Sequence, residues 1–189
     1  MVFRLGCLVK VINIFLLLFL FLIVILNSTW FLKIIYPEPY KEIVEEVSQI
    51  YQLDPYLIYA VMRVESKFNP EAQSKKGARG LMQLLPETGS WIARELKYES
   101  FDVDKLFDPE YNINLGAWYL SYLNKQFDNN TVLVIAAYNG GETNVKKWLK
   151  ENIWSGNISD LENIPFKETR EYVNKVLTDY ETYKKIYEK

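Results

Sequence analysis

The sequence contains no histidine and only one cysteine, and each shortage excludes a class of function. Without histidine the chain can have no imidazole-based catalytic triad, no histidine metal ligand and no histidine proton shuttle. Cys7 stands alone, so neither a disulfide within the chain nor a cysteine metal cluster can form. It also precedes the hydrophobic run, where it is not placed as a lipoprotein cysteine.

Clustered positive charge is also missing. Residues 1–33 contain Arg4, Lys10 and Lys33 and no acid, which leaves 19 basic and 24 acidic residues in the remainder, a net charge of −5. No basic block or interleaved basic patch occurs, so nucleic acid is not expected to be a partner.

The acidic residues do not form a recognisable metal motif. Asp102, Asp104 and Asp108 fall within one segment, but their spacing lacks the glycine and the terminal glutamate of a calcium-binding EF-hand loop. We interpret this segment as a solvated acidic loop, and no metal or cofactor is expected.

A long hydrophobic run lies near the N-terminus. Residues 11–26 contain one polar residue, Asn13, and no charge, and the run continues to residue 35 with only Lys33 charged. This length suits a transmembrane helix of about 20 residues. Arg4 and Lys10 precede it, which favours a cytoplasmic N-terminus and an exported remainder.

A cleaved signal peptide is the alternative, but no small-residue cleavage site follows Leu26. We therefore predict a cytoplasmic tip and signal anchor over residues 1–35 and a folded domain over residues 36–189. The expected location is the cell membrane, with a single pass and the domain outside the cytoplasm.

The remainder of the chain has the spacing of helices. Apolar periodicity and proline start signals predict helices over residues 40–51, 55–68, 86–96, 109–127, 142–150 and 167–187. Residues 131–138 are β-branched and apolar, so their propensity alone would allow a strand, but their place between helical patterns favours a helix. Residues 98–107 and 155–163 read as irregular connections. The expected fold class is mainly α.

Glu65 is the candidate for acid–base chemistry. It lies on the apolar stripe of the second of these helices, which is formed by Leu57, Ile58, Val61, Val64 and Phe68. A carboxyl group in such surroundings is costly to ionise, so its pKa rises and it can hold a proton near neutral pH, as a general acid must. The alternative is that Glu65 sits at the edge of the stripe and reaches water.

Several ordered blocks carry a family resemblance. ESKFNPEAQS from Glu65 and GARGLMQLLPET from Gly77 are followed by NLGAWYLSYL from Asn114, AAYNGG from Ala136 and IPFKETREYV from Ile164. Together they resemble the soluble lytic transglycosylase domain, a relative of goose-type lysozyme, over about residues 40–180. The resemblance implies a lysozyme-like single domain with a cleft between helical lobes, so that residues 36–189 would be the catalytic domain.

The resemblance also implies a reaction. Glu65 would be the single general acid/base that cleaves the β-1,4 bond between N-acetylmuramic acid and N-acetylglucosamine in peptidoglycan and closes a 1,6-anhydro ring. Ser74, Gln83, Tyr138 and Glu168 match positions that bind the glycan or organise the cleft. Leu85 stands where some relatives have methionine, so one subsite is expected to differ.

Other interpretations remain open at this point. The same cleft could serve a hydrolytic muramidase, or a non-catalytic scaffold that binds glycan near a secretion or division assembly of the cell wall. Gln83 could be a satisfied glutamine in a buried loop, Tyr138 a core aromatic, and Glu168 a charge stabilised by a helix N-terminus. The 29 aromatic residues fit a tyrosine-rich core, faces that stack on sugars, or both.

Overall fold

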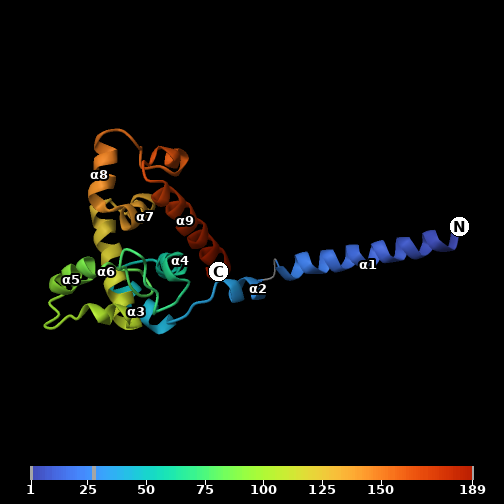
Figure 1. Ribbon diagram of the computed structural model, residues 1–189, viewed down its shortest axis with the longest axis horizontal. Helices are drawn as coiled ribbons and strands as arrows, with labels where there is room; N and C mark the ends of the chain where they lie inside the picture. The colour runs from blue at the N-terminus through green and yellow to red at the C-terminus, as the bar shows by residue number, and fades with distance from the viewer. Residues whose placement is uncertain (1, 27–28, 189) are drawn as a thin grey trace. The chain divides into compact units, whose positions relative to one another are not determined.

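The computed structural model describes the backbone of residues 2–26 and 29–188 and the side chains of residues 9–25 and 30–188. The chain divides into two compact units (Figure 1). One runs from the N-terminus to Pro37 and includes the last residues from Ile186, and the other is Glu38–Lys185. The side chains of Arg4 and Cys7, and the Asn27–Ser28 segment considered for cleavage, lie outside the described residues.

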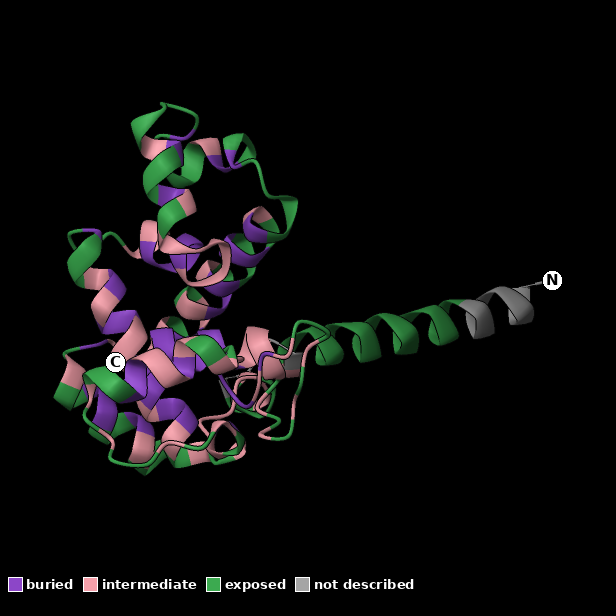
Figure 2. Cartoon of the chain, turned by 60° about the vertical axis from the view of Figure 1, so that its left-hand side comes forward, coloured by how far each residue is buried: buried purple, intermediate pink, exposed green. Residues whose placement is uncertain are grey.

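The first unit contains helices α1 (Val2–Leu26) and α2 (Thr29–Ile35). Every large apolar side chain described between Val9 and Val24 is exposed (Figure 2). No helix among the described residues combines the length and the hydrophobicity that a bilayer crossing requires. The predicted transmembrane anchor therefore stays a prediction.

The second unit is built from helices, and the described residues contain no strand, only two isolated β-bridges. The mainly α prediction is confirmed, including the helix where propensity allowed a strand. The elements are α3 (Lys41–Tyr51), α4 (Pro55–Ser66), α5 (Pro86–Glu95), α6 (Pro109–Gln126), α7 (Thr131–Gly140), α8 (Glu142–Lys150), α9 (Lys167–Tyr187) and two 3₁₀ helices, η1 (Val103–Phe107) and η2 (Ile158–Asn163).

The two 3₁₀ helices correct the sequence prediction, which treated both segments as irregular. The carboxylate of Asp102 accepts a hydrogen bond from the backbone N–H of Asp104 and so caps η1. Asp160 accepts bonds from both the N–H and the hydroxyl of Ser155 and so ties η2 to the segment before it. Neither helix is long enough for apolar periodicity to reveal it, because five or six residues form at most two turns of a 3₁₀ helix.

Helix α6 is the central element of this unit. It packs against α3, α5, α7 and η1 (Figure 1). The carboxylate of Asp108 accepts bonds from the first N–H groups of the helix, and Pro109 occupies its first turn. Ile113, Ala117, Leu120 and Leu123 are fully buried, as their helical spacing predicts.

Helix α4 is fixed against α9. Asp54 caps its N-terminus through the N–H of Tyr56, and the other carboxylate oxygen of Asp54 accepts a bond of 2.7 Å from the hydroxyl of Tyr180 on α9. Arg63 of α4 pairs with the buried Asp179 of α9 at 2.6 Å. These bonds set the position of the last turn of α4, where Glu65 lies.

The loop between α4 and α5 is held by side chains from three helices. Asn112 of α6, which is fully buried, accepts a bond of 2.7 Å from the N–H of Met82 and donates to the carbonyls of Arg79 and Leu106. Ser66 of α4 donates to the carbonyl of Leu81 at 2.8 Å. The loop also buries Leu81, Met82 and Leu84, and these hydrogen bonds fix how its backbone lies beside α4 and α6.

Two glycines allow this close packing. A Cβ atom at Gly80, whose φ is +75°, would lie 2.0 Å from the carbonyl oxygen of Leu106. A Cβ atom at Gly116 on α6 would lie 2.2 Å from the sulfur of Met82. The loop can therefore approach α6 only because both positions lack a side chain.

We predict that Asn112→Ala will destabilise the domain by about 2 kcal/mol or more, because it leaves the buried N–H of Met82 and the carbonyl of Leu106 without partners at about 1–3 kcal/mol each, whereas the carbonyl of Arg79 still accepts from the N–H of Leu84. Asn114→Ala is the matched control, since Asn114 is only half-buried and its side chain accepts one bond, from the hydroxyl of Tyr51. Its expected cost is about 1 kcal/mol. Urea unfolding of both variants measures the difference, and equal losses would contradict the anchoring role of Asn112.

Candidate active site

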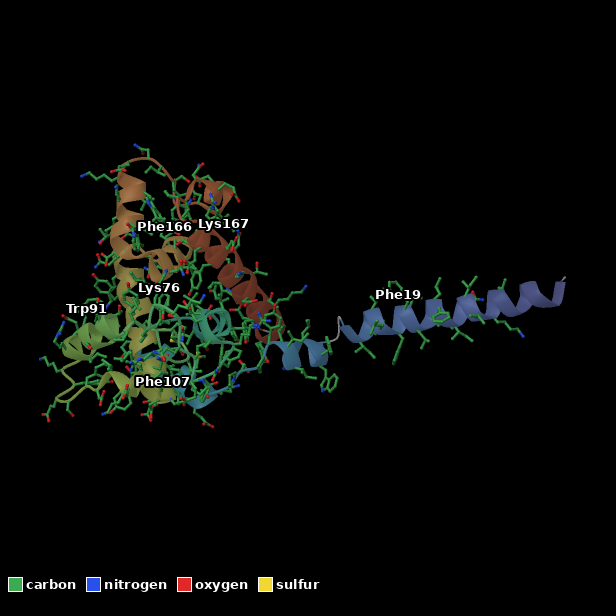
Figure 3. The ribbon with its side chains drawn as sticks, viewed as in Figure 1. Phe19, Lys76, Trp91, Phe107, Phe166 and Lys167 are labelled. Carbon is green, nitrogen blue, oxygen red and sulfur yellow. The ribbon has the colours of Figure 1, made fainter. Side chains whose placement is uncertain are left out.

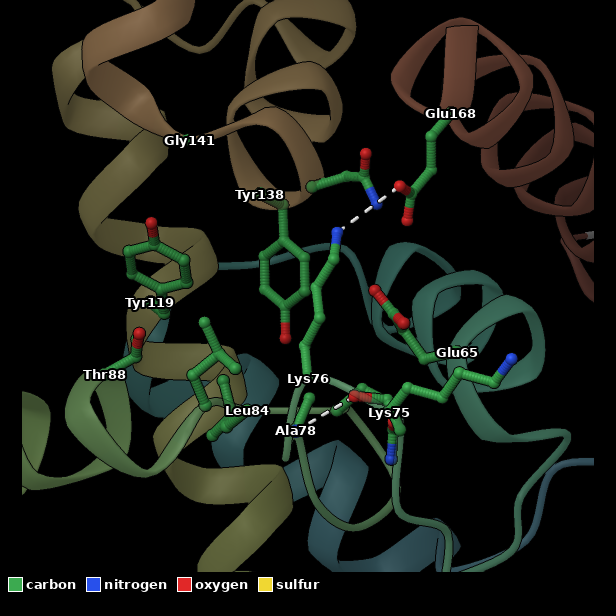
Figure 4. Close-up of a pocket in the computed structure, with 14 residues that line it drawn as sticks. Glu65, Lys75, Lys76, Ala78, Leu84, Thr88, Tyr119, Tyr138, Gly141 and Glu168 are labelled. Carbon is green, nitrogen blue, oxygen red and sulfur yellow. Dashed lines mark hydrogen bonds and ion pairs between the residues drawn. The ribbon is translucent and has the colours of Figure 1, made fainter. Parts of the chain in front are cut away.

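A cavity of about 440 Å³ opens in the second unit, and it brings the sequence-predicted residues together. Glu65 comes from α4, Ser74 and Gln83 from the α4–α5 loop, Tyr138 from α7 and Glu168 from α9, and all five line the cavity. Figure 4 shows Glu65 and Tyr138 facing the same space from different helices. The roles assigned to these residues remain predictions.

Glu65 has the electrostatic environment that the sequence predicts. Burial raises the pKa of its carboxyl group from 4.5 to about 7, and the negative charge of Glu168 adds to the increase. A hydrogen bond from Tyr172 acts in the opposite direction, because it stabilises the ionised form and lowers the pKa. Near neutral pH the group therefore exchanges a proton readily.

Two buried tyrosines, Tyr138 and Tyr172, surround this carboxyl group. Burial raises the pKa of both phenols well above 10, and the charge of Glu65 raises them further. The Tyr172 hydroxyl has no partner at standard hydrogen-bond geometry, so its interaction with Glu65 is a loose one. Both phenols stay protonated near neutral pH, which leaves Glu65 as the group beside them that titrates there.

Gln83 has a structural task as well as a place in the cavity. Its side-chain nitrogen donates to the carbonyls of Ala72 and Gly80, each at 2.9 Å, so both amide N–H groups are used within the loop. Only the amide oxygen remains to contact a ligand, and it can only accept. Gln83 therefore combines both interpretations that the sequence left open, because its amide nitrogen is satisfied within the loop while its side chain lines the cavity.

Ser74 and Tyr138 each use their hydroxyl group in one hydrogen bond within the protein. The Ser74 oxygen accepts from the N–H of Ala78 at 3.0 Å, which leaves its own proton for a ligand. The Tyr138 hydroxyl donates to the carbonyl of Met82 at 2.8 Å, so toward a ligand it can only accept. The cavity wall thus presents a donor at Ser74 and acceptors at Gln83 and Tyr138.

Glu168 lies at the mouth of the cavity. It is largely exposed, and its carboxylate is 3.5 Å from the ammonium of Lys76, which reaches across from the loop (Figure 4). An ion pair with this exposure contributes little to stability. Its charge still contributes to the raised pKa of Glu65.

Several cavity residues were not predicted from the sequence. Lys75, Lys76, Tyr119 and Asn139 line the cavity, and Tyr172 interacts with Glu65. The spacing of Tyr172 on α9 is typical of a core residue, and Tyr172 is buried. No local signal distinguishes a buried tyrosine that faces a carboxyl group from one that faces aliphatic side chains.

The acidic segment has structural roles. Asp102 caps η1, Asp108 caps α6, and Asp104 pairs with Arg79 at 2.6 Å. The three carboxylates therefore hold this segment and the loop rather than converge on one point.

Comparison with known proteins identifies the family. The model of the transglycosylase SLT domain matches residues 42–160. The soluble lytic murein transglycosylase of Escherichia coli strain K12 is 36% identical over 152 residues, which are 78% of this chain and 23% of the relative. A putative soluble lytic murein transglycosylase of Haemophilus influenzae is 39% identical over 166 residues, 86% of this chain and 28% of the relative.

Solved structures agree with this assignment. The 70 kDa soluble lytic transglycosylase of Escherichia coli has a TM-score of 0.76 at 34% identity, covering 82% of this chain and 25% of that chain, and one structure holds it in complex with bulgecin A. An inactive glutamate-to-glutamine mutant of the lytic transglycosylase Slt from Pseudomonas aeruginosa has a TM-score of 0.73 at 36% identity, over 82% of this chain and 25% of that chain.

This chain spans about a quarter of the length of these relatives. The family model covers α4, the α4–α5 loop and α7, which carry Glu65, Ser74, Gln83 and Tyr138, and it ends before α9, which carries Glu168. The chain belongs to the transglycosylase SLT domain family.

Proposed function

We propose that this protein is a peptidoglycan lytic transglycosylase in which Glu65 is the single general acid/base. The observation that carries the proposal is one carboxyl group, with a pKa raised to about 7 by burial, in a cavity lined by groups that can bind sugars. The names of the relatives in the same family support it, as does the inactivity of the glutamate-to-glutamine mutant among the solved structures.

The raised pKa suits both halves of the reaction. Protonated Glu65 gives its proton to the oxygen that leaves when the bond between N-acetylmuramic acid and N-acetylglucosamine breaks. The 2-acetamido group of the substrate stabilises the developing positive charge. Ionised Glu65 then takes the proton of the muramic 6-hydroxyl, whose oxygen bonds to the anomeric carbon and closes the 1,6-anhydro ring. No water is consumed, and the nucleophile is already held within the substrate.

Each surrounding group can make the hydrogen bonds to the glycan that its bonds within the protein leave available. Ser74 donates to the glycan, whereas the amide oxygen of Gln83 and the hydroxyl oxygen of Tyr138 accept from its hydroxyl or amide N–H groups. Tyr172 limits the rise in the pKa of Glu65, because it favours the ionised form that the second half of the reaction needs. Glu168 favours the protonated form that begins it.

Glu65→Gln tests the proposal directly. The amide keeps the shape of the side chain but cannot transfer the proton, and general acid–base catalysis contributes about 10²–10⁴-fold. We expect the release of anhydro-muropeptides from purified sacculi, measured by mass spectrometry, to fall by at least that much. Products with reducing muramic ends would instead identify a hydrolytic muramidase.

Thermal melts provide the control for folding. Because the pKa of Glu65 is raised from 4.5 to about 7, the folded state binds the proton more tightly, and the wild-type protein loses stability as the pH rises through this interval. The Glu65→Gln protein has no such loss, so it should be the more stable of the two above pH 7. A folded Glu65→Gln protein with wild-type activity would refute the assignment.

The pH dependence of activity gives a second prediction. The first step needs protonated Glu65, so activity should decline as the pH rises past about 7. Glu168→Gln removes a charge that raises the pKa of Glu65, and the decline should move to lower pH. Tyr172→Phe removes a group that lowers this pKa, and the decline should move to higher pH. Rate profiles of the three proteins measure the two opposite displacements, and displacements in the same direction would contradict this account.

We also propose that residues 1–35 anchor the enzyme to the cytoplasmic membrane, with the domain of residues 36–189 outside it. The charge-free residues 11–26 support this, as do the exposed apolar side chains of α1 and the position of Arg4 and Lys10 before the run.

External protease tests this topology. When it is added to wall-stripped cells it should remove the domain and leave a short membrane-bound stub, while a cytoplasmic marker protein stays intact. Protection of the domain in sealed cells, or a mature N-terminus after residue 26, would rule the anchor out.

A further inference from the structure

The wall of the cavity continues beyond the residues that line it. Thr88 of α5 and Tyr119 of α6 belong to the cavity wall. Residues three apart lie on the same face of a helix, so Trp91 and Tyr122 extend these two faces by one turn. Tyr119 also contacts Tyr138 of the cavity, with 5.4 Å between ring centroids. A continuous aromatic surface therefore leads away from Glu65.

The rings on this surface are ordered. Trp118 and Tyr119 of α6 both stack on Tyr122, at interplanar angles of 9° and 11° and centroid distances of 5.6 and 6.2 Å. Trp91 of α5 meets Trp118, Tyr119 and Tyr122 edge-on, at 78°, 89° and 82°. We call these four residues the aromatic platform.

The four platform residues are not fully buried in the core. Trp91, Trp118 and Tyr119 pack against the buried side chains Leu84, Ile92, Leu106 and Leu115. All four platform residues are nevertheless only half-buried, so each leaves part of its side chain to solvent. Figure 3 labels Trp91 beside α5, in the middle of that helix.

Polar groups border the platform. The charge and hydrogen bonding of Glu142, at the start of α8, act on the hydroxyl of Tyr122. Lys146 donates to the carboxylate of Glu142 and, at 2.7 Å, to the amide oxygen of Gln126. Flat apolar faces beside hydroxyl, carboxylate and ammonium groups match the chemistry of a sugar, which has C–H faces and a rim of hydroxyls.

We propose that the aromatic platform is a distal glycan subsite, which holds a part of the strand beyond the sugars at Glu65. The inference rests on the proposed function, because the ligand is the same peptidoglycan strand that the cavity takes. Its physical basis is the continuity of the platform with the cavity wall. A strand bound at Glu65 and leaving along α5 and α6 lies against the platform.

The test uses the full-length Glu65→Gln protein, so that the strand is bound but not cut, with fluorine-labelled tryptophan. Long, peptide-free peptidoglycan strands should change the fluorine resonances of Trp91 and Trp118. The buried Trp148 and Trp154 serve as internal controls, and their resonances should stay unchanged. A disaccharide fragment that fills only the cavity should leave all four unchanged.

A variant measures the energetic contribution. Trp91→Leu should weaken the binding of long strands roughly two- to tenfold, the range expected for one aromatic contact, without weakening the binding of the disaccharide. Phe107→Leu is the matched control, because Phe107 is also half-buried but contacts Arg79 at the bottom of the unit in Figure 3. It should change neither affinity.

The outcomes separate the two proposals. Binding of long strands with unchanged Trp91 and Trp118 resonances, or equal weakening for both ligand lengths in Trp91→Leu, would overturn the distal subsite alone. Failure of the folded Glu65→Gln protein to bind either ligand would refute the proposed function. If Trp91→Leu does not fold, the fluorine spectra of the Glu65→Gln protein still decide the question.

Discussion

The amide of Asn112 is the interaction on which the site depends. It satisfies one backbone N–H and two backbone carbonyls at once, and it does so where no water reaches. The backbone of the α4–α5 loop pairs with itself at two isolated bridges, Gln73–Arg79 and Arg79–Leu84, and beyond these bridges a buried side chain supplies the partners that a helix or sheet would supply elsewhere. Ser66 and Tyr138 complete the arrangement from α4 and α7. The backbone of Leu81 and Met82 is thereby bonded to side chains from three helices.

This bonding of the loop explains why Glu65 can be buried and still line the cavity. The groups that hold the loop near it are neutral, so none of them neutralises the carboxyl group with an opposite charge. Desolvation then dominates its pKa, and the two modifiers, Tyr172 and Glu168, both stand on α9. The position of a single helix therefore sets the balance between the protonated and ionised forms. That position is in turn fixed by contacts with α4, among them the Arg63–Asp179 pair.

The helices could be predicted from the sequence because their signals are local. Asp54 and Asp108 stand before Pro55 and Pro109, and apolar residues then recur at helical spacing. The direction of the Glu65 pKa shift was predictable in part, because Leu57, Ile58 and Val61 of its own helix are buried, but the tyrosines that surround the carboxyl group come from α7 and α9. Asn112 was not assigned a role, because two of its three partners are 30 and 33 residues distant in the chain and the third, the carbonyl of Leu106, lies in another element. Lys76 and Tyr172 were missed on similar grounds: their significance comes from packing between elements, which no periodicity records.

The contact between Gly116 and Met82 limits which substitutions the sequence can accept at these two positions. The thioether occupies the space that a side chain on α6 would need, so the two positions share one fixed volume. Residue 116 can become larger only if Met82 moves aside or has first become smaller, and shortening Met82 first is possible because it leaves a void and not a clash. Substitutions at this point of the fold therefore have an order: residue 82 of the loop must move or change before residue 116 of α6 can become larger.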